Sequence, residues 1–140
     1  MTAVEVLPGL HIKTGLTPDR EIPAHWARLT IRQGQTPQHP ADVLHIKLPD
    51  DAPWPTQVVQ QIVAFIESRL ARGVPVLVEC VAGVSHSPSA VVAYLAYRDG
   101  LNVHQALDKL RGVYPPADPS ARILDSLDAY FSQQAQSASS

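Results

Sequence analysis

The chain has 140 residues, 45% of them hydrophobic, with a single cysteine and a formal net charge of −2 at pH 7. This length and composition suit one globular domain with one core, and the weak negative charge argues against a basic surface for nucleic acid or membrane. One cysteine cannot form an internal disulfide, and the sequence shows neither a signal-peptide pattern nor an 18-residue apolar run. We therefore expect a soluble, cytoplasmic protein.

The first half of the chain predicts short strands joined by turns. Apolar residues on both sides of Pro8-Gly9 favour a hairpin. Thr17 and Pro18 are typical of the N-cap and the first position of a helix, which would be short. The expected strands are 4–6, 10–12, 29–31 and 43–48, with a surface loop over 33–40.

The second half predicts helices around one central strand. Apolar residues at three- and four-residue spacing favour a helix over 55–72. The unbroken apolar run at 75–79 is typical of a central parallel strand buried on both faces. Asn102, with Gln105 three residues later, is close to a capping-box pattern. The later helices are expected at 88–98, after Asn102, and after Ser120 with an apolar stripe through Phe131.

Strands that alternate with helices, followed by a run of helices, favour an α/β fold. We expect a central, mostly parallel, twisted sheet flanked by helices, in one domain over residues 1–131. Residues 132–140 consist only of Gln, Ser and Ala. Because such a segment offers little apolar surface to bury, we expect it to form a disordered tail.

The most informative segment surrounds the lone cysteine, Cys80, at the end of the central strand. A short loop containing Gly83 follows, and a helix is expected to open at Ser87-Pro88. A loop of backbone amides before a helix N-terminus favours an anion, because unpaired N–H groups and the helix dipole both attract negative charge. The same surroundings stabilise a thiolate, the nucleophilic form of cysteine. The alternative is a buried, unreactive cysteine.

The segment resembles the signature loop of the dual-specificity protein phosphatases, which runs His-Cys-x-x-Gly-x-Ser-Arg-Ser. This chain has Glu79-Cys80-x-x-Gly83-x-Ser85-His86-Ser87. The resemblance covers residues 7–131. It includes a strand-to-loop segment ending at Asp50, 30 residues before the cysteine, where the family carries its general-acid aspartate, and a Pro-rich turn before the last helix. It implies the fold of this family.

The resemblance also implies hydrolysis of a phosphomonoester, on a phosphorylated protein or a small molecule, through a phosphocysteine on Cys80. Asp50 would protonate the leaving oxygen and then activate water, with Asp51 as the alternative acid and Ser87 stabilising the leaving thiolate. No cofactor is implied, and the histidines outside the loop show no metal-ligand spacing. The phosphate, or a sulfate in its place, would bind Val81, Ala82, Gly83, Val84, Ser85, His86 and Ser87.

Two positions depart from the family signature. His86 replaces an arginine whose guanidinium would bind two phosphoryl oxygens and keep its charge, whereas histidine is mostly neutral at pH 7. Glu79 replaces a histidine; its carboxylate either lies near Cys80 and repels a phosphate dianion, or points away and accepts backbone N–H groups. We therefore expect weak or lost turnover. The alternatives are a non-catalytic pseudophosphatase that binds phosphate or a phosphorylated partner, and a rhodanese-like sulfurtransferase.

Overall fold

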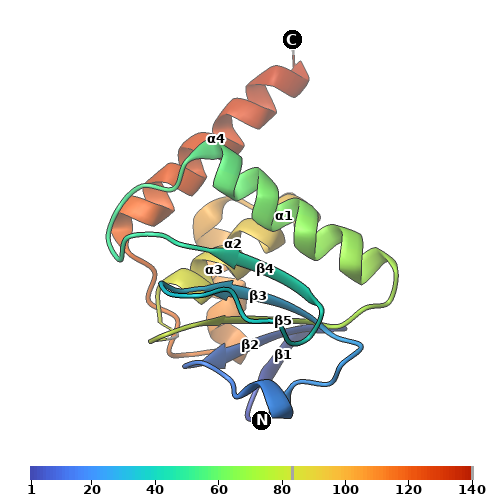
Figure 1. Ribbon diagram of the computed structural model, residues 1–140. Helices are drawn as coiled ribbons and strands as arrows, with labels where there is room; N and C mark the ends of the chain where they lie inside the picture. Colours follow the sequence, from blue (N-terminus) through green and yellow to red (C-terminus); the bar gives the residue numbers. More distant parts are fainter. Residues whose placement is uncertain (83, 140) are drawn as a thin grey trace.

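A five-stranded sheet with strand order β1-β2-β5-β3-β4 organises the computed structural model, which describes residues 1–82 and 84–139. Four α-helices accompany it in the described residues (Figure 1). The elements in chain order are β1 (Val4–Leu7), β2 (Leu10–Thr14), the 3-10 helix η1 (Asp19–Glu21), β3 (Ala27–Ile31), β4 (Asp42–Ile46), α1 (Thr56–Ala71), β5 (Val76–Cys80), α2 (His86–Asp99), α3 (Val103–Val113) and α4 (Ala121–Ser139).

The sheet is parallel except at one edge. Strands β2, β5, β3 and β4 run parallel, and β1 pairs antiparallel with β2 through a turn in which Gly9 adopts a φ of +86°. β5 lies at the centre, and all five of its residues are buried. The structure thus confirms the α/β class, the mostly parallel sheet and the buried central strand.

The two faces of the sheet have different covers. Because side chains alternate along a strand, Ile31 of β3 and Cys80 of β5, which pair in register, point to the face where α1 and α2 pack and the hydrophobic core forms. Arg28 and Glu79 point to the opposite face. There the connection between β2 and β3, which hydrogen-bonds to both side chains, provides the cover.

Most expected elements are confirmed with shifted ends. α3 follows Asn102 with a complete capping box: the Gln105 N–H donates to the Asn102 side chain at 2.9 Å, and the Asn102 N–H donates to Gln105 Oε1 at 3.1 Å. α2 begins at His86, two residues earlier than predicted. The short helix after Thr17 is the 3-10 turn η1, and Pro18 rather than Thr17 occupies its N-cap, so the expected side-chain cap is wrong.

Helix α4 extends further than the composition of the tail suggests. Residues 132–139 are helical in the structure, where a disordered tail was expected, and residue 140 lies outside the described residues. Ile123 and Leu127 are fully buried and fix the first turns of α4 on the core. Ala and Gln, which have good helix propensity, then continue a helix that packing has already nucleated.

The described part of the chain has neither a membrane-spanning helix nor a cluster of metal ligands. No helix there combines the length and the hydropathy that a membrane crossing requires. No group of three or more His, Cys, Asp or Glu side chains there is arranged to hold a metal ion.

Candidate active site

The cysteine loop lies at the carboxyl end of the central strand. Cys80 is the last residue of β5 and is 3% exposed, and α2 begins six residues later. In open parallel sheets this end of the strands is where ligands bind. Gly83, one of the predicted phosphate-binding residues, lies outside the described residues.

Ser87, at the start of α2, provides a backbone contact to the sulfur of Cys80. The Ser87 backbone N–H donates to Cys80 Sγ at 3.4 Å, and the Ser87 hydroxyl is fully buried without a hydrogen-bond partner among the described residues. Both groups belong to the first turn of α2, so the positive end of the helix dipole is directed at the sulfur. A buried hydroxyl without a protein partner costs free energy until a ligand or water meets it. The arrangement therefore suits an oxyanion beside Cys80.

The described outer part of the loop is tied to the turn before α4. Val81 and Val84 expose 66% and 38% of their surface. The Val84 carbonyl accepts the Asp118 N–H at 2.7 Å, and the Ser85 hydroxyl oxygen accepts the Ser120 N–H at 3.0 Å. The sequence gives no local signal for these contacts, because they join segments more than 30 residues apart.

His86 connects the cysteine loop to the segment that carries Asp50. Its Nε2 donates to the Pro49 carbonyl oxygen at 2.9 Å, since a carbonyl can only accept. The side chain is 9% exposed, and its ring centroid lies 6.3 Å from that of Trp54. At the position of the signature arginine, this chain therefore has a buried ring whose Nε2 bonds to the backbone next to the expected acid.

The segment that carries Asp50 is fixed at two further points. The Ser120 hydroxyl donates to the Asp51 carboxylate, and the Trp54 N–H donates to the Ser126 hydroxyl oxygen at 3.0 Å. Asp50 is exposed and has no hydrogen-bond or ion-pair partner among the described residues. The two neighbouring aspartates thus differ: Asp51 is bonded to Ser120, whereas the Asp50 carboxyl meets no described partner.

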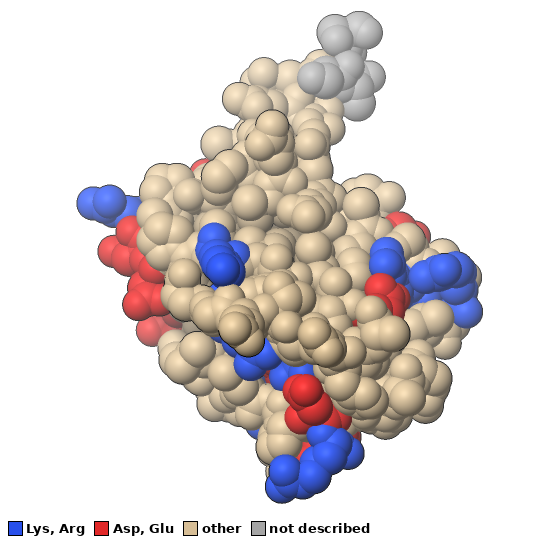
Figure 2. Space-filling model, viewed as in Figure 1, with Lys and Arg blue, Asp and Glu red and all other residues tan. Residues whose placement is uncertain are grey.

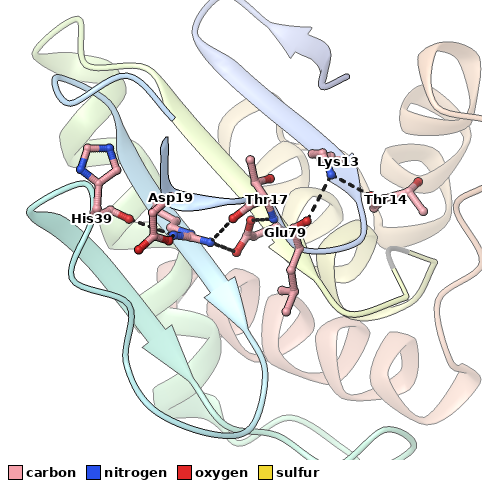
Figure 3. A network of polar contacts seen from close by, with 8 residues as sticks. Lys13, Thr14, Thr17, Asp19, His39 and Glu79 are labelled. Atoms are coloured by element: carbon pink, nitrogen blue, oxygen red, sulfur yellow. Dashed lines mark hydrogen bonds and ion pairs between the residues drawn. The ribbon is translucent and has the colours of Figure 1, made fainter. Parts of the chain in front are cut away.

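Glu79 and Cys80 are neighbours on β5 and therefore point to opposite faces of the sheet. Figure 3 shows the Glu79 side chain in a polar network with Thr17 and Asp19. Its Oε1 accepts the Thr17 N–H at 2.9 Å, and its Oε2 lies 3.0 Å from Arg28 Nε and 2.9 Å from Arg28 Nη2. Glu79 and Arg28 are both 0% exposed. Of the two alternatives for Glu79, the structure shows the second: the carboxylate points away from the cysteine loop, and Arg28 compensates its charge.

Arg28 extends this network to two further segments. Its Nη2 donates to the Thr17 carbonyl at 2.8 Å, and its Nη1 donates to the Asp19 carboxylate at 2.7 Å and to the His39 carbonyl at 2.8 Å. The hydrogen bond from Arg28 holds the pKa of Asp19 below its ordinary value. The sequence does carry a signal for the pair, because opposite charges within otherwise apolar strands are rarely buried without each other.

Residues 26–133 match the family described as "Dual specificity phosphatase, catalytic domain". Dual specificity protein phosphatase 1 of Arabidopsis thaliana is 31% identical over 102 residues, which is 71% of this chain and 52% of that protein. Dual specificity protein phosphatase Mpk3 of Drosophila melanogaster is 34% identical over 71 residues, which is 51% of this chain and 17% of that protein. The chain thus spans about half or less of the length of these relatives.

Solved structures share the fold over nearly the whole chain. Human DUSP28 superposes with a TM-score of 0.76 at 22% identity, covering 95% of each chain. The human tyrosine phosphatase-like serine/threonine/tyrosine-interacting protein superposes with a TM-score of 0.80 at 22% identity, covering 95% of this chain and 97% of the other. Identities this low establish the fold alone, but the family match spans most of the chain, from before β3 into α4. The chain therefore belongs to the dual specificity phosphatase family.

Proposed function

We propose that the chain binds phosphomonoesters in the Cys80 loop and hydrolyses them slowly through a phosphocysteine. The observation that carries this proposal is the Ser87 N–H directed at Cys80 Sγ, together with the buried Ser87 hydroxyl, which has no hydrogen-bond partner within residues 1–82 and 84–139. These donors, together with the dipole of α2, lie where negative charge has to be stabilised on a thiolate or a phosphoryl oxygen. Membership of the phosphatase family supports the same chemistry.

The proposed reaction has two steps. The Cys80 thiolate attacks phosphorus, so that the P–S bond forms while the P–O bond to the leaving group breaks, and Asp50 gives its proton to the leaving oxygen. Asp50 then takes a proton from a water molecule that attacks phosphorus, and the P–S bond breaks to release inorganic phosphate and the thiolate. Asp50 is assigned this role over Asp51 because the Asp51 carboxylate is already bonded to Ser120.

The low rate follows from His86. A guanidinium at this position would bring a permanent charge and two parallel donors to the phosphoryl oxygens, and arginines in comparable roles contribute roughly 10³ to 10⁵ in rate. The His86 Nε2 is instead bonded to the Pro49 carbonyl. Glu79 does not add to this loss, because its charge is paired with Arg28 on the other face of the sheet.

The bond between His86 and Pro49 also favours a second candidate function, a domain that binds phosphate without hydrolysing it. Backbone amides and a helix N-terminus bind an oxyanion without help from a clamping side chain. Affinity for a phosphorylated protein or a small phosphoester can therefore persist after turnover is lost.

Two measurements test these proposals. Thermal unfolding in phosphate, sulfate or vanadate tests binding, and the melting temperature should rise with anion concentration because the folded state alone holds the site. Hydrolysis of an aryl phosphate tests catalysis. We expect turnover to disappear in Cys80→Ser, to rise at least tenfold in His86→Arg, and to fall further in Asp50→Asn than in the matched variant Asp51→Asn.

The outcomes separate the two candidate functions. Anion binding without turnover, in both the wild type and His86→Arg, would assign the second function. Turnover that persists in Cys80→Ser would refute the phosphocysteine mechanism. A melting temperature that stays constant up to tens of millimolar anion would refute both proposals.

A further inference from the structure

A groove of about 890 Å³ lies between α1 and the C-terminal half of α4. Residues where α2 ends and α3 begins, among them Tyr97 and Leu101, also line the groove. α2 starts at the cysteine loop and has 14 residues, so the groove lies roughly 20 Å along this helix from Cys80. The volume is within the range of natural binding pockets. The groove is thus a separate surface from the proposed active site.

The two walls of the groove are stripes of helical residues. α1 presents Gln60, Ala64 and Ser68, which are four residues apart, and α4 presents Phe131 and Ala135. The eight-residue interval along α1 spans about 12 Å, which equals roughly two turns of a helix. In Figure 1 the C-terminal end of α4 extends beyond the body of the protein. An open groove of this length between two helices has the dimensions to accept a short third helix.

The charges of the groove are of one sign. Glu67 on α1 and Asp128 on α4 line it, and no Lys or Arg does so among the residues that the structure describes. The Tyr94 hydroxyl donates to Glu67 Oε2 at 2.7 Å; burial and this bond raise the pKa of the Tyr94 hydroxyl, so it remains a donor to the carboxylate.

Aromatic rings accompany the two carboxylates. Tyr97 is 52% exposed, and Tyr130 and Phe131 are partly buried against the core. Aromatic faces attract cations as well as apolar groups. The surface is therefore complementary to apolar side chains that have a lysine or an arginine beside them.

We propose that this groove binds a short helical segment of a partner protein, with apolar residues at i, i+3 or i+4, and i+7 and with lysine or arginine next to them. A second copy packed groove to groove does not fit, because it would place Glu67 and Asp128 against their own like charges. The described part of the projecting end of α4 also offers no cation, as Figure 2 shows. This binding function is independent of the phosphatase chemistry.

A displayed library of random 14-residue peptides, selected on the full chain, tests the proposal. Counter-selection uses Ala64→Arg, which places a long cationic side chain in the groove from an exposed position on α1. We expect the enriched peptides to carry net positive charge and apolar residues at helical spacing. The Kd of a synthetic consensus peptide should rise at least tenfold in Asp128→Lys.

The matched control is Asp125→Lys, on the exposed surface of the same helix but outside the groove, which should leave the Kd within twofold. All three positions are exposed, so the variants should keep the melting temperature of the wild type. Any of three results would overturn the proposal. The enriched peptides could be neutral or acidic, the Kd could be unchanged in Asp128→Lys, or the library could yield no binder that Ala64→Arg weakens. If sedimentation shows that the chain dimerises and that Asp128→Lys abolishes the dimer, a second copy occupies the groove and the proposal is overturned.

Discussion

Removing one partner of the buried pair between Arg28 and Glu79 should strongly destabilise the domain. In Arg28→Met the fully buried Glu79 carboxylate keeps its hydrogen bond from the Thr17 N–H. It loses the hydrogen bond from Arg28 Nε and the ion pair that compensates its charge. Breaking a buried pair in this way costs about 3–5 kcal/mol. Glu79→Gln keeps an oxygen that can accept the Thr17 N–H. The Arg28 guanidinium then has Asp19, whose side chain is 56% exposed, as its remaining counter-charge, so we expect a loss of about 3 kcal/mol in the free energy of unfolding.

These costs are large compared with the whole stability of a domain, which is about 5–15 kcal/mol. At about 3 °C per kcal/mol, the melting temperature should fall by roughly 10–15 °C in Arg28→Met. Arg98→Met is the matched control, because Arg98 is 47% exposed in its ion pair with Asp99 and such pairs contribute about 0–1 kcal/mol.

Urea unfolding followed by tryptophan fluorescence gives the free energies of the two single variants and of the double variant Arg28→Met/Glu79→Gln. The double variant leaves no buried charge uncompensated, so it should cost less than the sum of the two single changes. Single changes that cost less than 1 kcal/mol each, or costs that simply add in the double variant, would refute this account of the pair.

Three further predictions concern single residues. His86→Ala should speed amide hydrogen exchange over residues 48–54. His86→Gln, whose side-chain amide can still donate, should keep part of the protection. Equal exchange in the wild type and both variants would show that the His86 ring does not hold this segment. A hydrogen bond from Arg69 holds the pKa of Asp42 below its ordinary value of 3.8, so this pair stabilises the fold above pH 3.8 and the contribution is lost as the pH falls through the lower value. When the free energy of unfolding is measured as the pH is lowered, Asp42→Asn should lack this part of the pH dependence. A stability curve parallel to that of the wild type would contradict the prediction. Asn102→Ala should cost about 1 kcal/mol in urea unfolding, because it removes one half of the capping box, whereas a cost near zero would mean that the cap is not stabilising.

Much of the fold could be predicted because its signals are local. The apolar run of β5, the period of α1 and the pair Asn102 and Gln105 each indicate an element without knowledge of the rest of the chain. Pro88 predicts a helix that starts at its own position, but α2 begins two residues earlier. Proline is also tolerated at the third position of a helix, where its missing N–H would have no partner within the helix. The extent of α4 depends on packing, which the composition of its tail does not reveal.

The direction of the site side chains was harder to predict, because it depends on remote partners. Glu79 is bonded to a residue 51 positions away and His86 to one 37 positions away. The direction of Glu79 follows from strand alternation once Cys80 is assigned to the helical face, whereas nothing in the sequence indicates the bond from His86. The roles of Cys80, Asp50 and Ser87 in catalysis remain predictions, and the family match gives no support to the rhodanese-like alternative.

The turn between α3 and α4 supplies no group to the proposed chemistry, yet it holds the outer side of the cysteine loop. The N–H groups of Asp118 and Ser120 bind Val84 and Ser85, and the Ser120 hydroxyl also reaches Asp51. The conformation of the cysteine loop therefore depends on a segment outside the loop. A graft of residues 80–87 into another scaffold would leave behind the segment that shapes it, so residues 114–120 should be transplanted together with the loop.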